Sequence, residues 1–242
     1  MKPILILFLA LCAFTVGAVD MCVEIKPPQV RAIKGVGRMW GETSTFWRNG
    51  TVINIGWMGG TSRQREAAWK RFQMLDNLTG LTLTRNADKE AQVRVSFDPK
   101  SGHWSYVGKD CLNIAKGKPT MNLALTAGIF GDTAEEWDRV ALHEGCHMLG
   151  MHHEHQHPKA GIPWDVPRVI ARYKAQQGWS EREIRWQVID RYKGNEFNGT
   201  AFDKTSIMQY AVDADLTLNG FSVGWNTKLS PSDIVFLKKI YP

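Results

Sequence analysis

Six of the seven histidines in this chain of 242 residues lie within one short segment, residues 143–157. Inside it the sequence reads His143-Glu-x-x-His147-x-x-Gly150-x-x-His153. Residues four apart share one face of a helix, so His143 and His147 can bind one metal ion together. Gly150 permits a left-handed turn that ends the helix, and the returning chain can bring His153 in as a third ligand. Three nitrogen ligands leave one coordination position open, which is typical of a catalytic zinc site.

Glu144 follows the first histidine of this motif. It leaves the helix about 100° around the axis from His143, and therefore lies beside the metal rather than on it. A carboxylate there suits a general base acting on metal-bound water. The alternative is a histidine-rich tract that binds metals loosely. We expect the remaining histidines of the segment to lie on the surface or behind the ligands; they are His152, His155 and His157.

Length and composition are those of an ordinary globular protein, with 43% hydrophobic and 22% charged residues. The chain is long enough for one large domain or two small lobes around a cleft. Its formal charge of +6 comes from scattered lysines and arginines. Because there is neither a long basic run nor a nucleic-acid motif, we expect no nucleic-acid partner.

Residues 1–18 have the features of a secretory signal peptide, with Lys2, an apolar run and small residues at the end. The apolar run is too short to span a bilayer comfortably, so no stable membrane insertion is expected. The sequence thus predicts a secreted, extracellular protein, with residues 19–39 as an N-terminal arm or short pro-segment. Three asparagines begin glycosylation sequences if the source is eukaryotic: Asn49, Asn77 and Asn198.

Loss of a signal peptide would leave three cysteines, Cys22, Cys111 and Cys146, so secretion predicts one disulfide and one leftover thiol. Cys146 shares an apolar helix stripe with Leu142 and Leu149 and should face the core. We expect Cys111 and Cys146 to form the pair. Cys22 would then be the leftover thiol, or could approach the metal and block it before activation.

Apolar periodicity predicts a sheet backed by two helices, followed by a more broken region. Strands are expected over 51–55, 81–84, 92–97, 104–107 and 120–125, and helices over 63–78, 133–150, 166–177, 180–192 and 232–240. Thr133-x-x-Glu136 is a capping box that opens the motif helix. The chain therefore divides near residue 150 into an upper and a lower lobe, with the metal between them.

Together with Ser206-Ile-Met208-Gln-Tyr210, the histidine motif resembles the astacin branch of the metzincin metalloproteases. That family places a glutamate, here Glu154, directly after the third histidine. Segment 102–108 is similar to its substrate-edge strand, and the resemblance extends over residues 40–242. It implies an α+β catalytic domain over these residues. A twisted mixed sheet and two long helices would form the N-terminal lobe, and a mostly helical or irregular C-terminal lobe would complete the cleft around one catalytic Zn²⁺.

The resemblance also implies a role for each site residue. The zinc ligands would be His143, His147 and His153, and Glu144 would polarise the attacking water. Met208 would form the hydrophobic base under the metal. Tyr210 would be an additional zinc ligand at rest and a hydrogen-bond donor to the tetrahedral intermediate, the alternative being a buried tyrosine with a satisfied hydroxyl.

Two features depart from the family pattern. In the family the residue at Glu154 meets the buried mature N-terminus, but the segment 19–37 shows no obvious processing site. Either this arm is trimmed later or Glu154 has another partner. Three cysteines also do not fit the two disulfides typical of an astacin domain.

We therefore expect a secreted zinc endopeptidase, a monomer that hydrolyses protein or peptide substrates through zinc-bound water activated by Glu144. An extended peptide would pair with the strand near 103–107. The alternative is a catalytically silent zinc-containing binding protein with the same fold, against which the intact Glu144 argues. A metzincin of the serralysin type is a third possibility, disfavoured by the absence of glycine- and aspartate-rich calcium repeats and by Glu154.

Overall fold

The computed structural model describes residues 22–24, 45–85, 90–125, 133–192 and 201–242. The expected signal peptide, most of the 19–39 arm and Asn198 lie outside these residues. In the described part no helix is long and apolar enough to cross a membrane.

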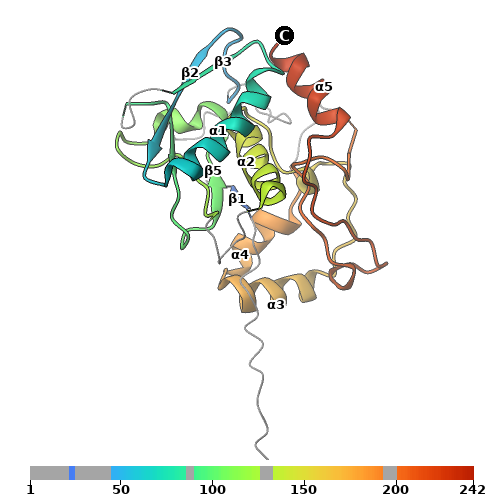
Figure 1. The fold of residues 1–242 in the computed structure, drawn as a ribbon. Coiled ribbons are helices and arrows are strands. Elements are labelled where there is room, and N and C mark those ends of the chain that lie inside the picture. Colours follow the sequence, from blue (N-terminus) through green and yellow to red (C-terminus); the bar gives the residue numbers. More distant parts are fainter. Residues whose placement is uncertain (1–21, 25–44, 86–89, 126–132, 193–200) are drawn as a thin grey trace, which may run out of the picture.

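A six-stranded mixed sheet forms one side of the molecule, with strand order β1-β5-β6-β4-β2-β3 (Figure 1). Its strands are β1 (Cys22–Glu24), β2 (Val52–Met58), β3 (Thr82–Arg85), β4 (Val93–Ser96), β5 (His103–Ser105) and β6 (Met121–Asn122). All neighbours pair in parallel except β5 and β6, which are antiparallel. The mixed sheet confirms the predicted fold class, whereas β1 was not among the expected strands.

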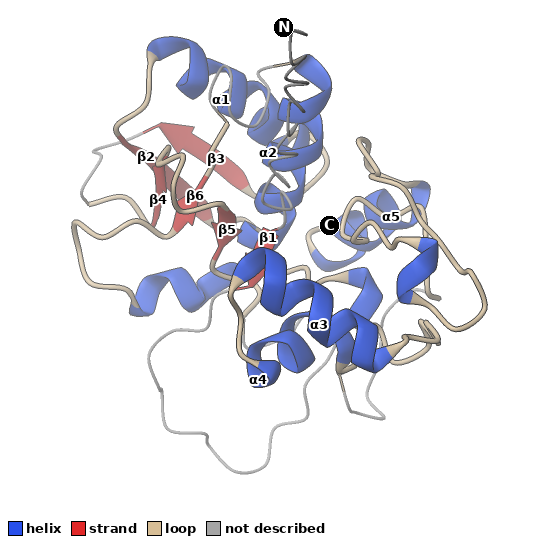
Figure 2. Cartoon of the chain, turned by 90° about the horizontal axis from the view of Figure 1, so that it is seen from below, coloured by secondary structure: helices blue, strands red, loops and turns tan. Residues whose placement is uncertain are grey.

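Two helices, α1 (Ser62–Asp76) and α2 (Ala134–Met148), lie side by side against the sheet (Figures 1 and 2). Helix α1 begins because the Thr61 side chain accepts the Gln64 N–H and Gln64 bonds back, a complete capping box. The helices cross closely at Gly145, where an added Cβ would lie 2.5 Å from Leu75 Cδ1. This close crossing fixes the helix that carries the histidine motif.

The expected capping box of α2 is only half formed. The Thr133 side chain accepts the Glu136 N–H at 3.1 Å, as predicted. The Glu136 carboxylate pairs instead with the Arg139 guanidinium at 2.9 Å, one turn further along. A charged partner three residues away on the same helix competes with the N-cap backbone for this carboxylate.

Beyond the motif the chain forms α3 (Val166–Gln177), α4 (Glu181–Ile184) and α5 (Pro231–Ile240), and the described residues 201–230 before α5 are mostly irregular. Helix α3 matches the prediction. The helix expected over 180–192 is shorter, because after α4 the backbone widens into a π-helical turn, Arg185–Ile189, closed by the Asp190 N–H on the Arg185 carbonyl.

Two clusters of buried side chains lie on either side of the motif. The larger cluster joins side chains of the sheet, α1, α2 and α5. At its edge the Tyr241 hydroxyl donates a 2.7 Å hydrogen bond to the Leu149 carbonyl. The smaller gathers side chains of α3 and α4 with Cys22 and Tyr210. Figure 2 shows β1 at the end of the sheet beside α3 and α4. The histidine motif thus lies where the two clusters meet.

None of the three described cysteines forms a disulfide, so the expected Cys111–Cys146 pair is wrong. Both side chains are buried in the larger cluster, where they pack as small apolar groups. Burial raises the pKa of the Cys111 thiol to about 12 and that of Cys146 well above its usual value. Both are therefore protonated and unreactive in the folded protein.

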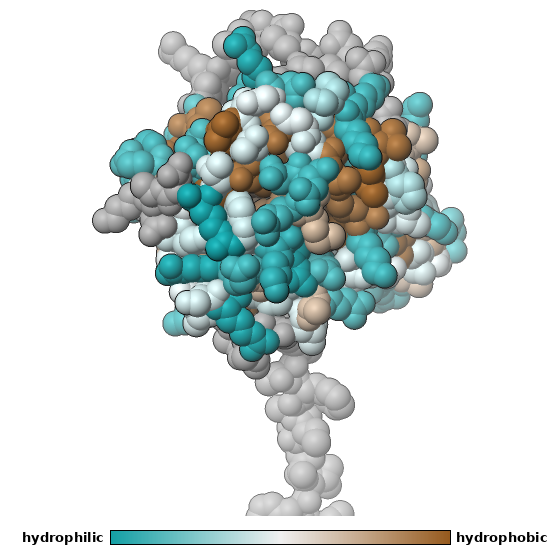
Figure 3. Space-filling model, turned by 45° about the horizontal axis from the view of Figure 1, so that its top comes forward, coloured by the Kyte–Doolittle hydropathy of each residue, from teal (hydrophilic) through white to brown (hydrophobic). Residues whose placement is uncertain are grey.

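The surface seen in Figure 3 is mostly hydrophilic, with hydrophobic residues gathered in separate patches.

Candidate active site

The motif helix α2 ends at a glycine, as its sequence predicts. Gly150 has φ of +95°, and an added Cβ would lie 2.6 Å from the Phe46 ring. Its N–H donates to His147 O, and the Met151 N–H donates to Cys146 O, a Schellman arrangement. Only glycine fits this turn, which sends the chain back toward the helix it has just left.

The returning chain brings His153 beside His143 and His147. The Nε2 atoms of His147 and His153 lie 2.9 Å apart, and the three ring centroids are separated by 4.5 to 5.2 Å. Tetrahedral zinc with Zn–N bonds of about 2.0–2.1 Å separates neighbouring ligand nitrogens by about 3.3 Å. The distance between the His147 and His153 Nε2 atoms is thus within a few tenths of an ångström of what such an ion requires.

Hydrogen bonds and burial fix the chemical state of these rings. His143 Nδ1 lies 2.7 Å from Ile207 O, and His147 Nδ1 lies 2.8 Å from Met151 O. A carbonyl only accepts, so each Nδ1 carries the proton and each Nε2 offers a lone pair. Burial, with the neighbouring His147, lowers the pKa of His143 and His153 well below the usual value. The rings of His143 and His153 are therefore neutral at pH 7 and suited to a metal ion.

Cys22 is a fourth member of this cluster. One ligand atom each from Cys22, His143, His147 and His153 can be chosen so that all lie within 4.8 Å of one another. A thiolate is a strong zinc ligand, so Cys22 can fill the position that three histidines leave open. The sequence allowed this placement as one of two options, but the residues around Cys22 carried no signal for it.

Strand β1 brings Cys22 to the cluster by pairing with β5, with Cys22 opposite His103. It thereby takes the outer edge of β5, where we expected an extended peptide to bind. Edge strands recruit added strands through their unpaired backbone groups. In this structure the chain's own N-terminal segment makes that pairing.

Tyr210 lies beside the rings of His153 and His155. Its ring centroid is 4.3 Å from that of His153, and it stacks on His155 at 4.1 Å and 25°. Its hydroxyl donates a hydrogen bond to the carbonyl oxygen of Cys22. The phenol is therefore beside the metal site, but in this structure it binds the N-terminal strand.

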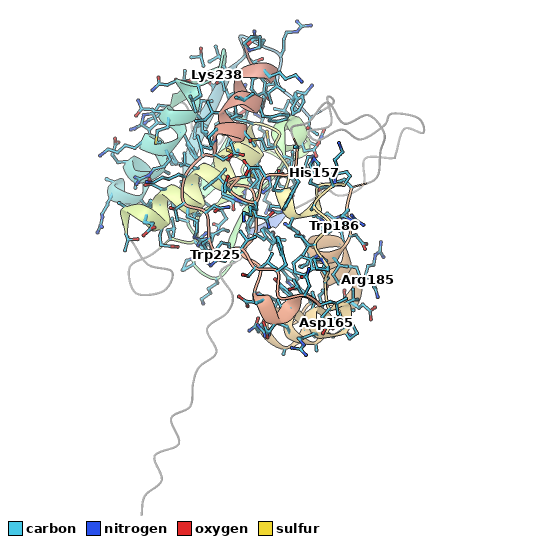
Figure 4. The ribbon with its side chains drawn as sticks, turned by 90° about the vertical axis from the view of Figure 1, so that its right-hand side faces the viewer. His157, Asp165, Arg185, Trp186, Trp225 and Lys238 are labelled. Carbon is cyan, nitrogen blue, oxygen red and sulfur yellow. The ribbon has the colours of Figure 1, made fainter. Side chains whose placement is uncertain are left out.

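Glu144 is buried and lines a pocket that opens beside His143. The other side chains around this pocket come from β1, β5, α2 and the chain between the Met208 turn and α5: Cys22, His103, Arg139, Val140, Ile207, Gln209, Tyr210, Trp225 and Asn226. Arg139 is held there by its ion pair with Glu136 and lies 4.5 Å above the Trp225 ring. In Figure 4 the Trp225 label lies between that of Lys238, in α5, and that of Asp165, which precedes α3.

Met208 is fully buried in a turn that is tied to α5. Asp233 accepts the Ser206 hydroxyl at 2.6 Å and the Ile207 N–H at 2.8 Å. The Ile207 carbonyl in turn accepts a hydrogen bond from the His143 Nδ1–H. Sequence reasoning missed Asp233; the capping box that it forms with Ser230 was the available signal.

Glu154 has the other partner that the sequence left open. Its Oε1 accepts the Asp203 N–H at 2.7 Å, and its own N–H donates to Met208 O at 2.9 Å. Burial raises the pKa of this carboxyl to about 8. It therefore braces the segment before the Met208 turn.

The three other histidines of the segment are buried, so of the two positions expected for them they take the one behind the ligands and not the surface. Each has a polar neighbour other than the metal cluster: His155 Nε2 is 2.9 Å from Gln187 O, His157 Nδ1 accepts the Lys159 N–H, and His152 lies 3.1 Å from the Tyr192 hydroxyl. They support the ligand segment from behind.

No family model matches the chain, but solved structures and curated sequences do. Two structures of myroilysin are similar: one is 36% identical, covers 83% of this chain and 97% of that one, with a TM-score of 0.78. The other is 32% identical, covers 91% and 99%, with a TM-score of 0.65. A hatching enzyme zinc-protease from medaka, Oryzias latipes, shares the fold at 17% identity, 81% and 93% coverage and a TM-score of 0.55.

Tolloid-like protein 1 of mouse and of human is 26% identical over 215 residues. The match takes in 82% of this chain, which spans about a fifth of the length of those relatives, 19%. The fold, the histidine cluster and the similarity to myroilysin together place the chain in the metzincin class. Within that class the chain belongs to the astacin-like family.

Proposed function

We propose that the protein is a secreted zinc endopeptidase that binds one Zn²⁺ through His143, His147 and His153 and uses Glu144 as general base. The observation that carries this proposal is the convergence of three buried imidazole groups next to a buried carboxylate, that of Glu144, one residue after His143 on the same helix. Its substrates would be proteins or peptides, as the family membership indicates. Secretion rests on the apolar segment 1–18 of the sequence.

A zinc ion in this site would lower the pKa of a water from about 15.7 to about 7 and polarise the substrate carbonyl. Glu144 takes the proton of the attacking water and passes it to the leaving amine. Tyr210, once its hydroxyl leaves the Cys22 carbonyl, donates to the oxyanion of the tetrahedral intermediate. Ile207 O and Met151 O hold the rings of His143 and His147 in the required tautomer.

In this structure the N-terminal segment keeps the proposed enzyme in a latent form. Cys22 lies within the ligand cluster, β1 takes the edge of β5, and the Tyr210 hydroxyl binds Cys22 O. A peptide substrate needs all three of these places. We infer that the N-terminal segment holds the enzyme inactive until it is cut or displaced.

The proposal is tested by zinc stoichiometry and by cleavage of casein or gelatin. We expect one zinc per chain, and loss of cleavage in Glu144→Ala with the zinc retained. His153→Ala should lose zinc, whereas the matched control His155→Ala should keep it. Because the N-terminal segment holds the chain inactive, the variants are compared under conditions in which the wild type cleaves casein. If Glu144→Ala then cleaves as fast as the wild type, the catalytic assignment is wrong, and a silent binding protein becomes the better explanation.

A further inference from the structure

His103 stands next to the metal cluster, although none of the roles assigned so far includes it. In the β1–β5 ladder it is the direct partner of Cys22. Residues paired across a ladder project their side chains to the same face of the sheet. Because the Cys22 thiol belongs to the ligand cluster, the His103 ring lies on the cluster side of β5 as well. It also lines the pocket with Glu144 and Tyr210.

One hydrogen bond fixes which nitrogen of this ring carries a proton. The Ala124 N–H donates to His103 Nδ1 at 3.0 Å. An amide N–H can only donate, so Nδ1 must hold a lone pair, and the neutral ring carries its proton on Nε2. His103 is buried, and the Ala124 contact holds the ring against the segment after β6. The ring is therefore a preset N–H donor on the wall of the pocket.

The N-terminal strand indicates what this donor faces during catalysis. β1 is an extended backbone at the edge of β5, and its Cys22 carbonyl accepts the Tyr210 hydroxyl. A peptide bound at the same edge has a carbonyl in a comparable place, between the Tyr210 side and the β5 side of the pocket. A donor on each side can share the negative charge that develops on this oxygen.

We propose that His103 is a further catalytic residue, whose Nε2–H donates to the oxyanion of the tetrahedral intermediate from the side opposite Tyr210. This inference rests on the endopeptidase function proposed above. A neutral imidazole suits the role because it donates a hydrogen bond without placing a second positive charge beside the metal. In a buried, preorganised site one such donor contributes about 10²–10³ in kcat.

Two substitutions separate this role from a purely structural one. His103→Asn keeps an acceptor near the position of Nδ1 for the Ala124 N–H but has no atom at the position of Nε2. His103→Gln places an amide N–H near Nε2 and gives up the Nδ1 acceptor. A catalytic donor predicts a loss of about 10²-fold or more in kcat for His103→Asn, with KM within about threefold, and a substantial rescue by His103→Gln.

Both variants are made in the full chain and compared under conditions in which the wild type cleaves casein. Zinc content and Tm are measured alongside, and the affinity for a phosphinic peptide, a mimic of the tetrahedral intermediate, is measured by calorimetry. Its Kd should weaken in His103→Asn in parallel with kcat. Full activity of His103→Asn, or equal losses in both variants at normal zinc content, would overturn the proposal.

Nitrogen NMR of the latent full chain gives a test that does not depend on activity. We expect His103 to show a protonated Nε2 and an unprotonated Nδ1, and the opposite tautomer rules out the donor role. The Glu144→Ala comparison stays separate: unimpaired cleavage by that variant rejects the endopeptidase mechanism itself, whatever the His103 variants do.

Discussion

The Asp233 carboxylate, at the start of the last helix, accepts the backbone N–H of Ile207 in the Met208 turn at 2.8 Å. The Ile207 carbonyl accepts a hydrogen bond from the Nδ1–H of His143 at 2.7 Å. A short chain of hydrogen bonds thus runs from α5 to His143, the first of the proposed metal ligands. The C-terminal helix therefore helps to orient a ligand that lies some ninety positions earlier in the sequence.

This link predicts the effect of Asp233→Asn. Asp233 accepts from Ser206 Oγ, Ile207 N and Ser230 N, and an amide must turn an N–H toward one of these donors. Because the group is buried, we expect a loss of about 2–3 kcal/mol in the free energy of unfolding and weaker zinc binding. Urea denaturation and zinc competition titration measure the two effects.

The matched control is Asp215→Asn, an exposed acid that pairs with Arg172 on the surface. Such a pair contributes at most about 1 kcal/mol, and zinc binding should not change. Equal effects of the two substitutions on the free energy of unfolding and on zinc binding would show that the hydrogen-bonded link from α5 to His143 does not support the metal site.

Local patterns in the sequence were sufficient for the elements that present the ligands. The periodicity of α1, α2 and α3, the N-caps of α1 and α2, and the glycine that ends α2 were predicted within a few residues. These features depend on neighbours three or four positions apart. The Met208 turn was found through its motif, and the structure adds that Asp233 supports it.

What the sequence could not indicate depends on pairing between distant segments. β1 has three residues and no alternating pattern, and it is a strand because it pairs with β5 about eighty positions later. The place of Cys22 at the cluster follows from that pairing alone. The expected Cys111–Cys146 disulfide failed for the same reason, since burial of both thiols does not imply that they meet.

Gly150→Ala should weaken both stability and metal binding. At φ of +95° an alanine is strained, and its Cβ would press on the Phe46 ring at 2.6 Å. Gly220→Ala is the control, because φ is +74° there and nothing lies within 4 Å of an added Cβ. The control should lose about 1–2 kcal/mol from backbone strain. Gly150→Ala should lose about 1–3 kcal/mol more from overpacking.

Zinc affinity separates the two glycines more sharply than stability does. A shift of the Gly150 turn moves His153 away from the other ligands, whereas Gly220 lies in a distant loop. Equal zinc affinity in both alanine variants would contradict the assigned role of the turn.

Glu154 gives the folded protein a pH dependence. Burial raises its pKa from 4.5 to about 8, so folding favours the protonated carboxyl. The stabilisation is complete below pH 4.5 and is lost as the pH rises through 8. Glu154→Gln can still accept the Asp203 N–H but cannot ionise. In metal-free protein, the stability of the wild type relative to this variant should therefore fall between pH 5 and pH 8, measured by urea denaturation; a constant difference would contradict it.

In the chain without the expected signal peptide, and therefore without Cys12, removal of zinc should expose one thiol. Cys22 is held at the ligand cluster, whereas Cys111 and Cys146 are buried with pKa values raised by burial. A chelator releases Cys22 from the metal, and the short strand β1 can then leave the edge of β5. We expect iodoacetamide to modify one cysteine after chelation and none before, as counted by mass spectrometry.

Cys22→Ser is the matched variant for this experiment, because it removes the thiol that contacts the cluster and leaves the two core thiols in place. It should show no modification with or without chelator. Because serine is a poor zinc ligand, it should also cleave casein faster than the wild type before any processing. Modification of Cys111 or Cys146 in the folded chain, or unchanged activity in Cys22→Ser, would contradict latency through Cys22.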